Sequence, residues 1–164
     1  ERRAVERLYA MKGMTAKQPL AFLLPDLSQI ATFGYVSNAA YRLMRREPLD
    51  FVQLTYNVLD REVEERLLPL AQDRGMAVVV NRPFQQGDLT RALEGEPLPD
   101  WAVEIGAASW AQFILKFILA HPAVTVAIPA TSRVDHVREN LAAATGPLPD
   151  EAMRRRMAAY VEQL

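Results

Sequence analysis

The sequence contains no cysteine, which excludes disulfide bonds and thiolate metal sites. It has only two histidines, His121 and His136, and lacks the HExxH pattern of zinc proteases. No apolar run reaches the roughly 20 residues that a membrane-spanning helix needs. The first residues are charged and lack the apolar block of a signal peptide. We therefore expect a cytoplasmic protein that binds no metal.

Net charge is also nearly absent, because 19 lysines and arginines face 20 aspartates and glutamates. Such a balance gives no general attraction to nucleic acids or anionic membranes, so we expect neither as a partner. The basic run Arg154–Arg156 is interpreted as the solvated face of a terminal helix. Of the 164 residues, 50% are hydrophobic and 24% are charged, which is typical of a globular protein with one core.

The apolar pattern predicts strands that alternate with helices. The unbroken run Met76–Val80 is typical of a parallel strand covered on both faces. Alternation of this kind predicts an α/β fold with four parallel strands, either an open sheet or half of a barrel. The predicted strands are 21–24, 51–54, 76–80 and 124–128. The predicted helices are 27–33, 38–46, 62–73, 88–94, 109–120, 133–143 and 149–163.

Residues 47–164 contain several motifs in order, including LDFVQLTYNVLDREVEERLLPLAQDRGMAVVVNRPF and SWAQFILKFILAHPAVTVAIPATSRVDHVRENL. This stretch resembles the carboxyl-terminal part of an aldo-keto reductase. Members of that family are (β/α)8 barrels that reduce carbonyl groups with NADPH. The resemblance implies the last three strands of such a barrel, with functional residues at the carboxyl ends of the strands.

The resemblance also implies which residues meet the cofactor. Gln53 matches a position that contacts the nicotinamide amide, and the segment IPATSRVDHVREN matches the one that holds the adenosine 2′-phosphate and the adenine. The start of a helix suits a phosphate, because its amides are unpaired. On the residues alone, the same segment fits a helix cap followed by a solvated arginine better, and only the resemblance makes a phosphate site an equal alternative. The cofactor-binding candidates are Gln53, Arg82, Thr131, Ser132, Arg133, Glu139 and Asn140.

The stretch departs from the family pattern at two positions. Ala130 stands where many members have a lysine, and Asn81 stands where many have the tyrosine that stacks on nicotinamide. An amide offers no aromatic face for such stacking. The family's Asp-Tyr-Lys-His tetrad comes from the first half of the barrel, so we predict no catalytic residue in this chain. Lys116 is expected to pack its stem and hold its ammonium in water.

Residues 1–46 include LYAMKGMTAKQPLAFLLPDLSQIATFGYVSNAAYRLMRR, which resembles an internal segment of a threonylcarbamoyl-AMP synthase. Lys12-Gly13-Met14 stands where that family has Lys-x-Arg. Ser37 and Asn38 also fit the Gly-Val-Ser-Asn segment that binds the carboxamide in aldo-keto reductases. Asn38 lies only 12 residues before Asp50, which is short for the helix of that family, so we assign Ser37 and Asn38 to the synthase-like part. We interpret the chain as a chimera joined within 43–46. Its two parts, 1–46 and 47–164, are expected to pack as one globular unit.

Three hypotheses for function follow. The first, which we favour, is a chimeric or truncated α/β protein without catalysis of its own. The second is a module that binds the adenosine end of NADPH around 131–140. The third is part of an active reductase whose tetrad lies on another chain or in an absent amino-terminal region. Because half a barrel leaves sheet edges and an apolar inner face uncovered, we also predict a homodimer.

Overall fold

The computed structural model describes residues 36–164, and residue contacts divide the chain into units 1–36 and 37–164. The strand predicted at 21–24, the helix predicted at 27–33 and Lys12 lie outside the described residues, as do the side chains of Ser37 and Asn38. The strands are β1 (Phe51–Thr55), β2 (Ala77–Asn81) and β3 (Val126–Ala127). The α-helices are α3 (Val36–Arg46), α4 (Val63–Asp73), α5 (Asp88–Ala92), α6 (Trp110–Leu119), α7 (Val134–Ala142) and α8 (Glu151–Val161). Short 3-10 helices span Gln85–Gly87 and Asp100–Ile105.

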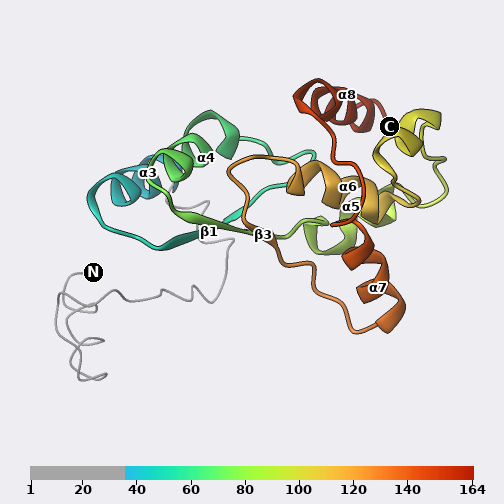
Figure 1. Ribbon diagram of the computed structural model, residues 1–164, viewed down its shortest axis with the longest axis horizontal. Helices are drawn as coiled ribbons and strands as arrows, with labels where there is room; N and C mark the ends of the chain where they lie inside the picture. Colours follow the sequence, from blue (N-terminus) through green and yellow to red (C-terminus); the bar gives the residue numbers. More distant parts are fainter. Residues whose placement is uncertain (1–35) are drawn as a thin grey trace. The chain divides into compact units, whose positions relative to one another are not determined.

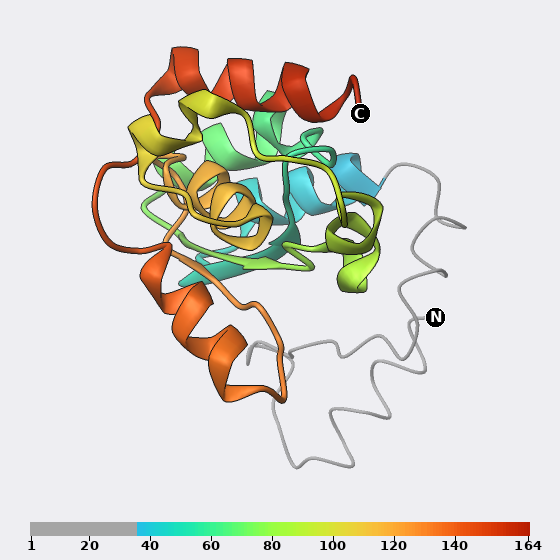
Figure 2. The ribbon, with the colours of Figure 1, turned by 90° about the vertical axis from the view of Figure 1, so that its right-hand side faces the viewer.

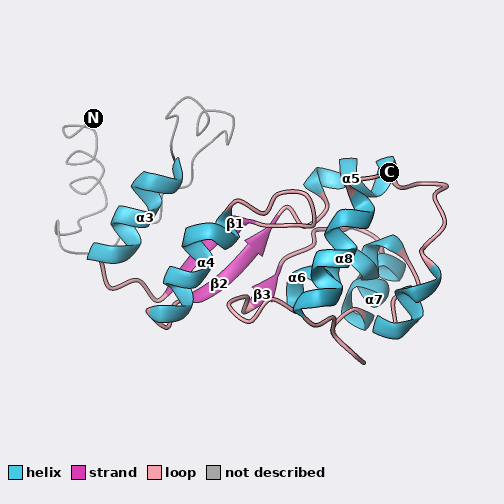
Figure 3. Cartoon of the chain, turned by 90° about the horizontal axis from the view of Figure 1, so that it is seen from above, coloured by secondary structure: helices cyan, strands magenta, loops and turns pink. Residues whose placement is uncertain are grey.

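The three strands form one parallel sheet in the order β1-β2-β3 (Figures 1 and 3). Gln53 of β1 lies beside Val79 of β2, which in turn lies beside Val126 of β3. Helix α4 connects β1 to β2, and α5 and α6 lie between β2 and β3 along the chain. This is the α/β class that the alternation predicted, with an open sheet, and each described strand overlaps its predicted range.

The two faces of the sheet differ in cover. Val78 and Val80 point to the helix side and are fully buried. In Figure 2, α6 lies between the sheet and α8 on that side, whereas α7 projects away from the other helices. On the opposite face, 60% of Phe51 and 41% of Val126 are exposed. Hydrophobic burial therefore holds the sheet to α4 and α6 and leaves its other face open.

Side-chain caps explain where two of the helices begin. The Ser109 hydroxyl accepts a hydrogen bond from the Gln112 amide at 3.3 Å, one turn into α6. The Asp150 carboxylate accepts from the Met153 amide at 2.7 Å and so caps α8. Each cap satisfies an amide that the helix itself leaves unpaired. Among the described residues, no helix is long and apolar enough to cross a membrane.

Two basic residues behave differently from the sequence-based expectation. Only 9% of Arg154 is exposed, so the solvated-face interpretation of Arg154–Arg156 is wrong for its first member. Its guanidinium donates to the Tyr56 hydroxyl and pairs with Glu64, because α8 turns this side chain toward α4. Lys116 is fully buried, and its ammonium donates to the carbonyls of Thr145 at 2.6 Å and Pro147 at 3.1 Å. Backbone carbonyls have replaced the water that we expected around it.

Candidate functional site

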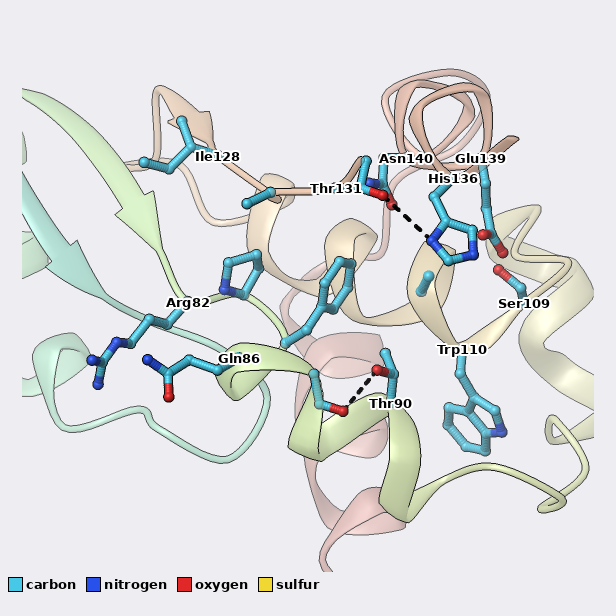
Figure 4. A pocket seen from close by; sticks show the side chains of 15 residues that line it. Arg82, Gln86, Thr90, Ser109, Trp110, Ile128, Thr131, His136, Glu139 and Asn140 are labelled. Carbon is cyan, nitrogen blue, oxygen red and sulfur yellow. Dashed lines mark hydrogen bonds between the residues drawn. The ribbon is translucent and has the colours of Figure 1, made fainter. Parts of the chain in front are cut away.

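A cavity of about 710 Å³ opens at the carboxyl ends of β2 and β3. Its walls come from the loop after β2, the start of α6, the loop after β3 and helix α7 (Figure 4). Its volume lies within the range of small-molecule sites. Its lining residues are Arg82, Pro83, Phe84, Gln86, Gly87, Thr90, Ser109, Trp110, Ala111, Ile128, Ala130, Thr131, His136, Glu139 and Asn140.

The loop after β2 has an unusual backbone. Arg82, Gln85 and Gln86 have φ angles of 49°, 50° and 61°, in the left-handed region that non-glycine residues seldom adopt. Gly87 follows with a φ of 93°, which glycine adopts without steric cost. Strained residues of this kind persist only where surrounding contacts hold them. The shape of this cavity wall therefore depends on the contacts that hold the loop in its left-handed conformation.

Asn57, the second residue after β1, is hydrogen-bonded to this loop. It is fully buried, and its side-chain oxygen accepts from the amides of Leu59 at 3.0 Å and Asp60 at 2.9 Å. Its amide nitrogen donates to Asp60 Oδ2 at 2.7 Å and to the Arg82 carbonyl at 3.4 Å. Asp60 Oδ2 also accepts from Gln85 Nε2 at 3.0 Å. Asn57 and Asp60 thus connect the turn after β1 to the left-handed loop.

The opposite wall is polar and comes from the loop after β3 and from α7. Thr131 Oγ1 lies 3.5 Å from His136 Nδ1 and accepts from the Arg133 amide at 3.1 Å. In Figure 4, the side chains of His136, Glu139 and Ser109 gather at one end of the cavity, and Arg82 extends away at the other end beside Gln86. One end of the cavity therefore offers hydroxyl, imidazole and carboxylate groups close together.

Besides Phe84, Trp110 provides aromatic surface to the cavity. It lies at the first position of α6, half-buried, and its ring is stacked on Tyr160 with 6.3 Å between centroids. Its indole nitrogen donates to the Glu96 carbonyl at 2.8 Å, which fixes the orientation of the ring. A fixed aromatic ring that lines a cavity suits contact with a planar ligand group.

Arg133 does not face the cavity. It is the residue before α7 and has an extended backbone, and its guanidinium is bidentate to Asp135. Arg133 Nε donates to Asp135 Oδ1 at 3.1 Å. This pair raises the pKa of Arg133, and the arginine lowers the pKa of Asp135 to about 2. Both side chains are exposed, so the cation is engaged on the surface of the helix start.

The structure brings together four of the seven predicted cofactor-binding residues. Arg82, Thr131, Glu139 and Asn140 line the cavity. Gln53 is exposed on the open face of the sheet and does not line it. Ser132 and Arg133 are exposed and also lie outside the lining. Cofactor contacts of Gln53, Ser132 and Arg133 therefore remain predictions.

Sequence reasoning missed Trp110 and His136. The helical apolar spacing of residues 109–120 includes Trp110 and indicates a core residue, but its position at the start of α6 sets it at the rim of the core. His136 precedes Glu139 and Asn140 by one helical turn, so all three share a face of α7. That spacing was a usable signal for His136. Within the described residues, no three histidine, aspartate or glutamate side chains converge as metal ligands would.

Tyr56 is the most buried tyrosine of the described residues, and it is unsuited to donate a proton. Its hydroxyl donates to Glu64 at 2.5 Å and accepts from Arg154. Burial, together with the bond to Glu64, raises its pKa well above the usual value. Lys116 binds carbonyls of the loop between α7 and α8 instead of a tyrosine hydroxyl. The described residues therefore hold no tyrosine-lysine pair of the kind that would supply an acid.

Comparison with known families covers most of the chain. The family described as "Aldo/keto reductase family" matches residues 28–160. The match runs without a break through 43–46, where we expected the chimera to be joined. The comparisons therefore give no support to a synthase-derived segment between residues 28 and 46, and the agreement of Ser37-Asn38 with the aldo-keto reductase pattern falls inside the match.

Solved structures with the same architecture include the holo form of an aldo-keto reductase from Bacillus halodurans, at 26% identity and a TM-score of 0.57. An aldo-keto reductase from Klebsiella pneumoniae in complex with NADPH is 27% identical, with a TM-score of 0.55. The chain spans less than half of each, 46% and 43%, while 76% and 75% of this chain is covered.

Curated relatives agree with the family match. An NADH-specific methylglyoxal reductase of Escherichia coli K12 is 43% identical over 54 residues, which cover 33% of this chain and 17% of that protein. A pyridoxal 4-dehydrogenase of Microbacterium luteolum is 31% identical over 112 residues, which cover 58% of this chain and 33% of that protein. The chain thus spans a third or less of these two relatives. By the extent of the family match, the chain belongs to the aldo/keto reductase family.

Proposed function

We propose that this chain is the cofactor-binding, carboxyl-terminal part of an aldo-keto reductase and has no catalysis of its own. The observation that carries the proposal is the cavity at the carboxyl ends of β2 and β3, where the family's barrels place functional residues. Its polar end and its fixed tryptophan suit the adenosine of a nicotinamide dinucleotide. When bound, such a cofactor supplies a hydride, whereas this chain's residues bind and orient it.

The residues present fit the adenosine part of such a cofactor. Thr131, Asn140 and Ser109 offer hydroxyl and amide groups, and Trp110 offers an apolar surface beside them. The resemblance implies NADP(H), and one relative is named as specific for NADH. Reduction of a carbonyl would need an acid from residues outside 36–164 or from another chain, because Tyr56 is engaged with Glu64 and Arg154.

Calorimetric titration of the purified chain with NAD⁺ and NADP⁺ tests the proposal. We expect saturable binding of at least one dinucleotide and a loss of about tenfold in affinity in Asn140→Ala, because a buried polar contact to the ligand disappears. Arg138→Ala is the matched control, since Arg138 lies on the same helix outside the cavity lining and should leave the affinity unchanged. Absence of binding of both dinucleotides at millimolar concentration would refute the proposal.

We also propose that two copies associate through the open face of the sheet. Phe51, Val126 and Ile128 expose 60%, 41% and 45% of their surfaces there, and the far edge of β3 has no partner strand among the described residues. The solved relatives contain about as much chain again as this one spans, so a second copy is similar in size to the missing half. Analytical ultracentrifugation at micromolar concentration should show a dimer that Val126→Lys dissociates. A monomer with the native sequence contradicts the proposal.

The hypothesis of a chimera is retained only for residues 1–27, which lie upstream of the family match. The genomic sequence that encodes the region before Glu1 tests it directly. A continuous aldo-keto reductase first half upstream would contradict the chimera and would favour a reductase with its own tetrad.

A further inference from the structure

Two walls of the cavity come from neighbouring helices that meet at its polar end. Ser109 and Trp110, at the start of α6, form one of these walls. His136, Glu139 and Asn140 of α7 form the other. Figure 4 shows the Ser109 side chain close to those of His136 and Glu139. The contacts between α6 and α7 therefore determine the shape of this end of the cavity.

Apolar burial contributes little to the position of α7. None of the residues of this helix is buried, although Ala143, which follows it, is fully buried. Val134, Val137 and Leu141 share one face of the helix and expose 66%, 42% and 66% of their surfaces. Packing of an apolar face is the usual force that holds a helix to a domain. Polar contacts near its carboxyl end therefore matter more for α7 than for the other helices.

Gln112, in the first turn of α6, contacts both helices without lining the cavity. Its Oε1 accepts a hydrogen bond from the Ala108 amide at 2.9 Å, just before α6. Its Nε2 donates to the carbonyl of Glu139 in α7 at 3.5 Å. Because the Ala108 amide can only donate, it fixes the oxygen of the Gln112 side chain at the start of α6. The nitrogen is thereby directed to α7.

The two ends of the Gln112 amide match the two helix ends between which it lies. The start of a helix has unpaired amides and a partial positive charge, and the last turn has unpaired carbonyls and a partial negative charge. The three amides that follow α7 donate to the carbonyls of Asn140, Leu141 and Ala142. The carbonyl of Glu139, which precedes these three, receives Gln112 Nε2. One neutral side chain thus satisfies an amide near α6 and a carbonyl of α7.

We propose that Gln112 is a positioning residue for the cavity. It holds the α7 wall against the α6 wall, so that both walls contact the same ligand. The proposal rests on the proposed function, because the position of α7 affects binding only if a dinucleotide occupies the cavity. Gln112 does not touch the ligand, so its loss should lower affinity through the displacement of α7.

Two substitutions separate the two hydrogen bonds of this side chain. Gln112→Glu keeps an acceptor for the Ala108 amide but cannot donate to the Glu139 carbonyl, and its charge is repelled by the end of α7. The affinity for whichever of NAD⁺ and NADP⁺ binds should fall at least about threefold. The urea midpoint should stay equal or rise, because a carboxylate suits the first turn of α6.

Gln112→Lys makes the opposite change, since it keeps a donor and removes the acceptor. Its urea midpoint should fall, because the Ala108 amide loses its partner and a cation is unfavourable at the start of a helix. It should nevertheless bind the dinucleotide at least about threefold more tightly than Gln112→Glu does. A residue that only stabilised α6 would give affinities that follow the urea midpoints, which is the reverse order. Calorimetric titration and urea denaturation measure the two quantities.

Hydrogen exchange of the backbone amides gives a measurement that needs no ligand. In Gln112→Glu, the amides of α7 should exchange about threefold faster, whereas those of β2 and α4 should exchange as in the unmodified protein. Arg154→Met is the control for a general loss of stability, because Arg154 lies outside the cavity lining. It should lower the urea midpoint and leave the affinity unchanged.

The possible outcomes distinguish the positioning role from the proposed function. If the unmodified protein binds neither dinucleotide at millimolar concentration, the proposed function fails, and the exchange rates alone decide whether Gln112 holds α7. Equal losses of affinity in Gln112→Glu and Gln112→Lys would overturn the positioning role, because the side chain would then act only through the stability of α6. Unchanged affinity and unchanged exchange of α7 in folded Gln112→Glu would overturn it as well.

Discussion

Polar side chains in this protein fall into two regions with different partners. On the helix side of the sheet, Lys116 and Arg154 are buried, and each donates to protein groups. At the cavity, His136 is exposed and Glu139 is half-buried, with few protein contacts. Buried polar groups must be paired to be tolerated, whereas exposed ones stay free to meet a ligand. The first region therefore supports the fold, and the second is the better candidate for recognition.

The two regions meet in the turn after β1. Tyr56 points into the network of Glu64 and Arg154, and the next residue, Asn57, holds the left-handed loop that forms one cavity wall. These two consecutive residues, which follow β1, thus contact different regions of the protein. Substitutions on the helix side should lower the free energy of unfolding without altering the affinity of the cavity for a ligand. Single variants can test this expectation.

The largest effect is expected at Arg154. Arg154→Met leaves the Glu64 carboxylate and the Tyr56 hydroxyl without their cation in a poorly hydrated setting. We expect a loss of about 2–3 kcal/mol in the free energy of unfolding, at the lower end for a buried pair because 32% of Glu64 is exposed. Urea denaturation followed by circular dichroism measures it.

Arg155→Met is the matched control for Arg154. Arg155 is the next residue, and its pair with Glu151 is exposed on both sides, at 67% and 78%. Exposed pairs contribute little, so the change should stay within about 0.5 kcal/mol. Equal losses in the two variants would show that the buried network does not stabilise the fold.

A smaller loss is expected at Asn57, which couples the two regions. Asn57→Ala leaves the amides of Leu59 and Asp60 without an acceptor in a buried turn. We expect about 2 kcal/mol less stability, together with weaker dinucleotide binding, because the loop that bears Arg82 and Gln86 loses its support.

Gln85→Ala is the matched control for Asn57→Ala, because it changes the loop after β2 and leaves the hydrogen bonds within the turn after β1 intact. It removes only the exposed hydrogen bond from Gln85 Nε2 to Asp60 Oδ2. The free energy of unfolding should therefore change by about 0.5 kcal/mol or less. If Asn57→Ala weakened stability but left binding intact, the turn after β1 would support the fold alone, and the proposed coupling would be wrong.

Sequence patterns anticipated the elements better than the site. Met76–Val80 is a short run of β-branched and other apolar residues that follows Gly75, and residues 109–120 have the apolar spacing of a helix, so β2 and α6 lie where expected. The strand predicted at 124–128 is shorter, Val126–Ala127, although the amides of Thr125 and Ile128 also donate to the carbonyls of Val78 and Val80 in β2, at 3.0 Å and 2.9 Å. Apolar patterns in a sequence indicate which side chains are buried. They therefore predict elements such as β2 and α6, whose residues are mostly buried.

The site depended on information that periodicity does not carry. Arg133 was a phosphate candidate, but the orientation of its guanidinium is set by Asp135, two residues away. Lys116 and Arg154 were expected in water, because charged residues usually are, and tertiary contacts decided otherwise. The left-handed backbone of Arg82, Gln85 and Gln86 had no signal in the sequence, since none of them is glycine.

The smallest effect is expected at His121, on the helix side, and it appears only as a dependence on pH. The His121 ring lies edge-on to Tyr56, at 5.7 Å between centroids, and its Nδ1 accepts from the Ala123 amide at 3.1 Å. Burial, and then the charge of Arg154, lower its pKa below the ordinary 6.5. The unfolded chain therefore binds this proton more readily than the folded chain does.

Stability should accordingly fall as the pH drops below about 6.5 toward the folded-state pKa, since the unfolded state gains the proton first. His121→Asn keeps an acceptor for the Ala123 amide but does not titrate. The difference in unfolding free energy between the unsubstituted protein and this variant should shrink as the pH falls from 7.5 to 5. The reason is that only the unsubstituted protein loses stability when His121 of its unfolded state takes up a proton. A difference that stays constant across this range would show that His121 titrates alike in both states, and that Arg154 and burial exert no net effect on it.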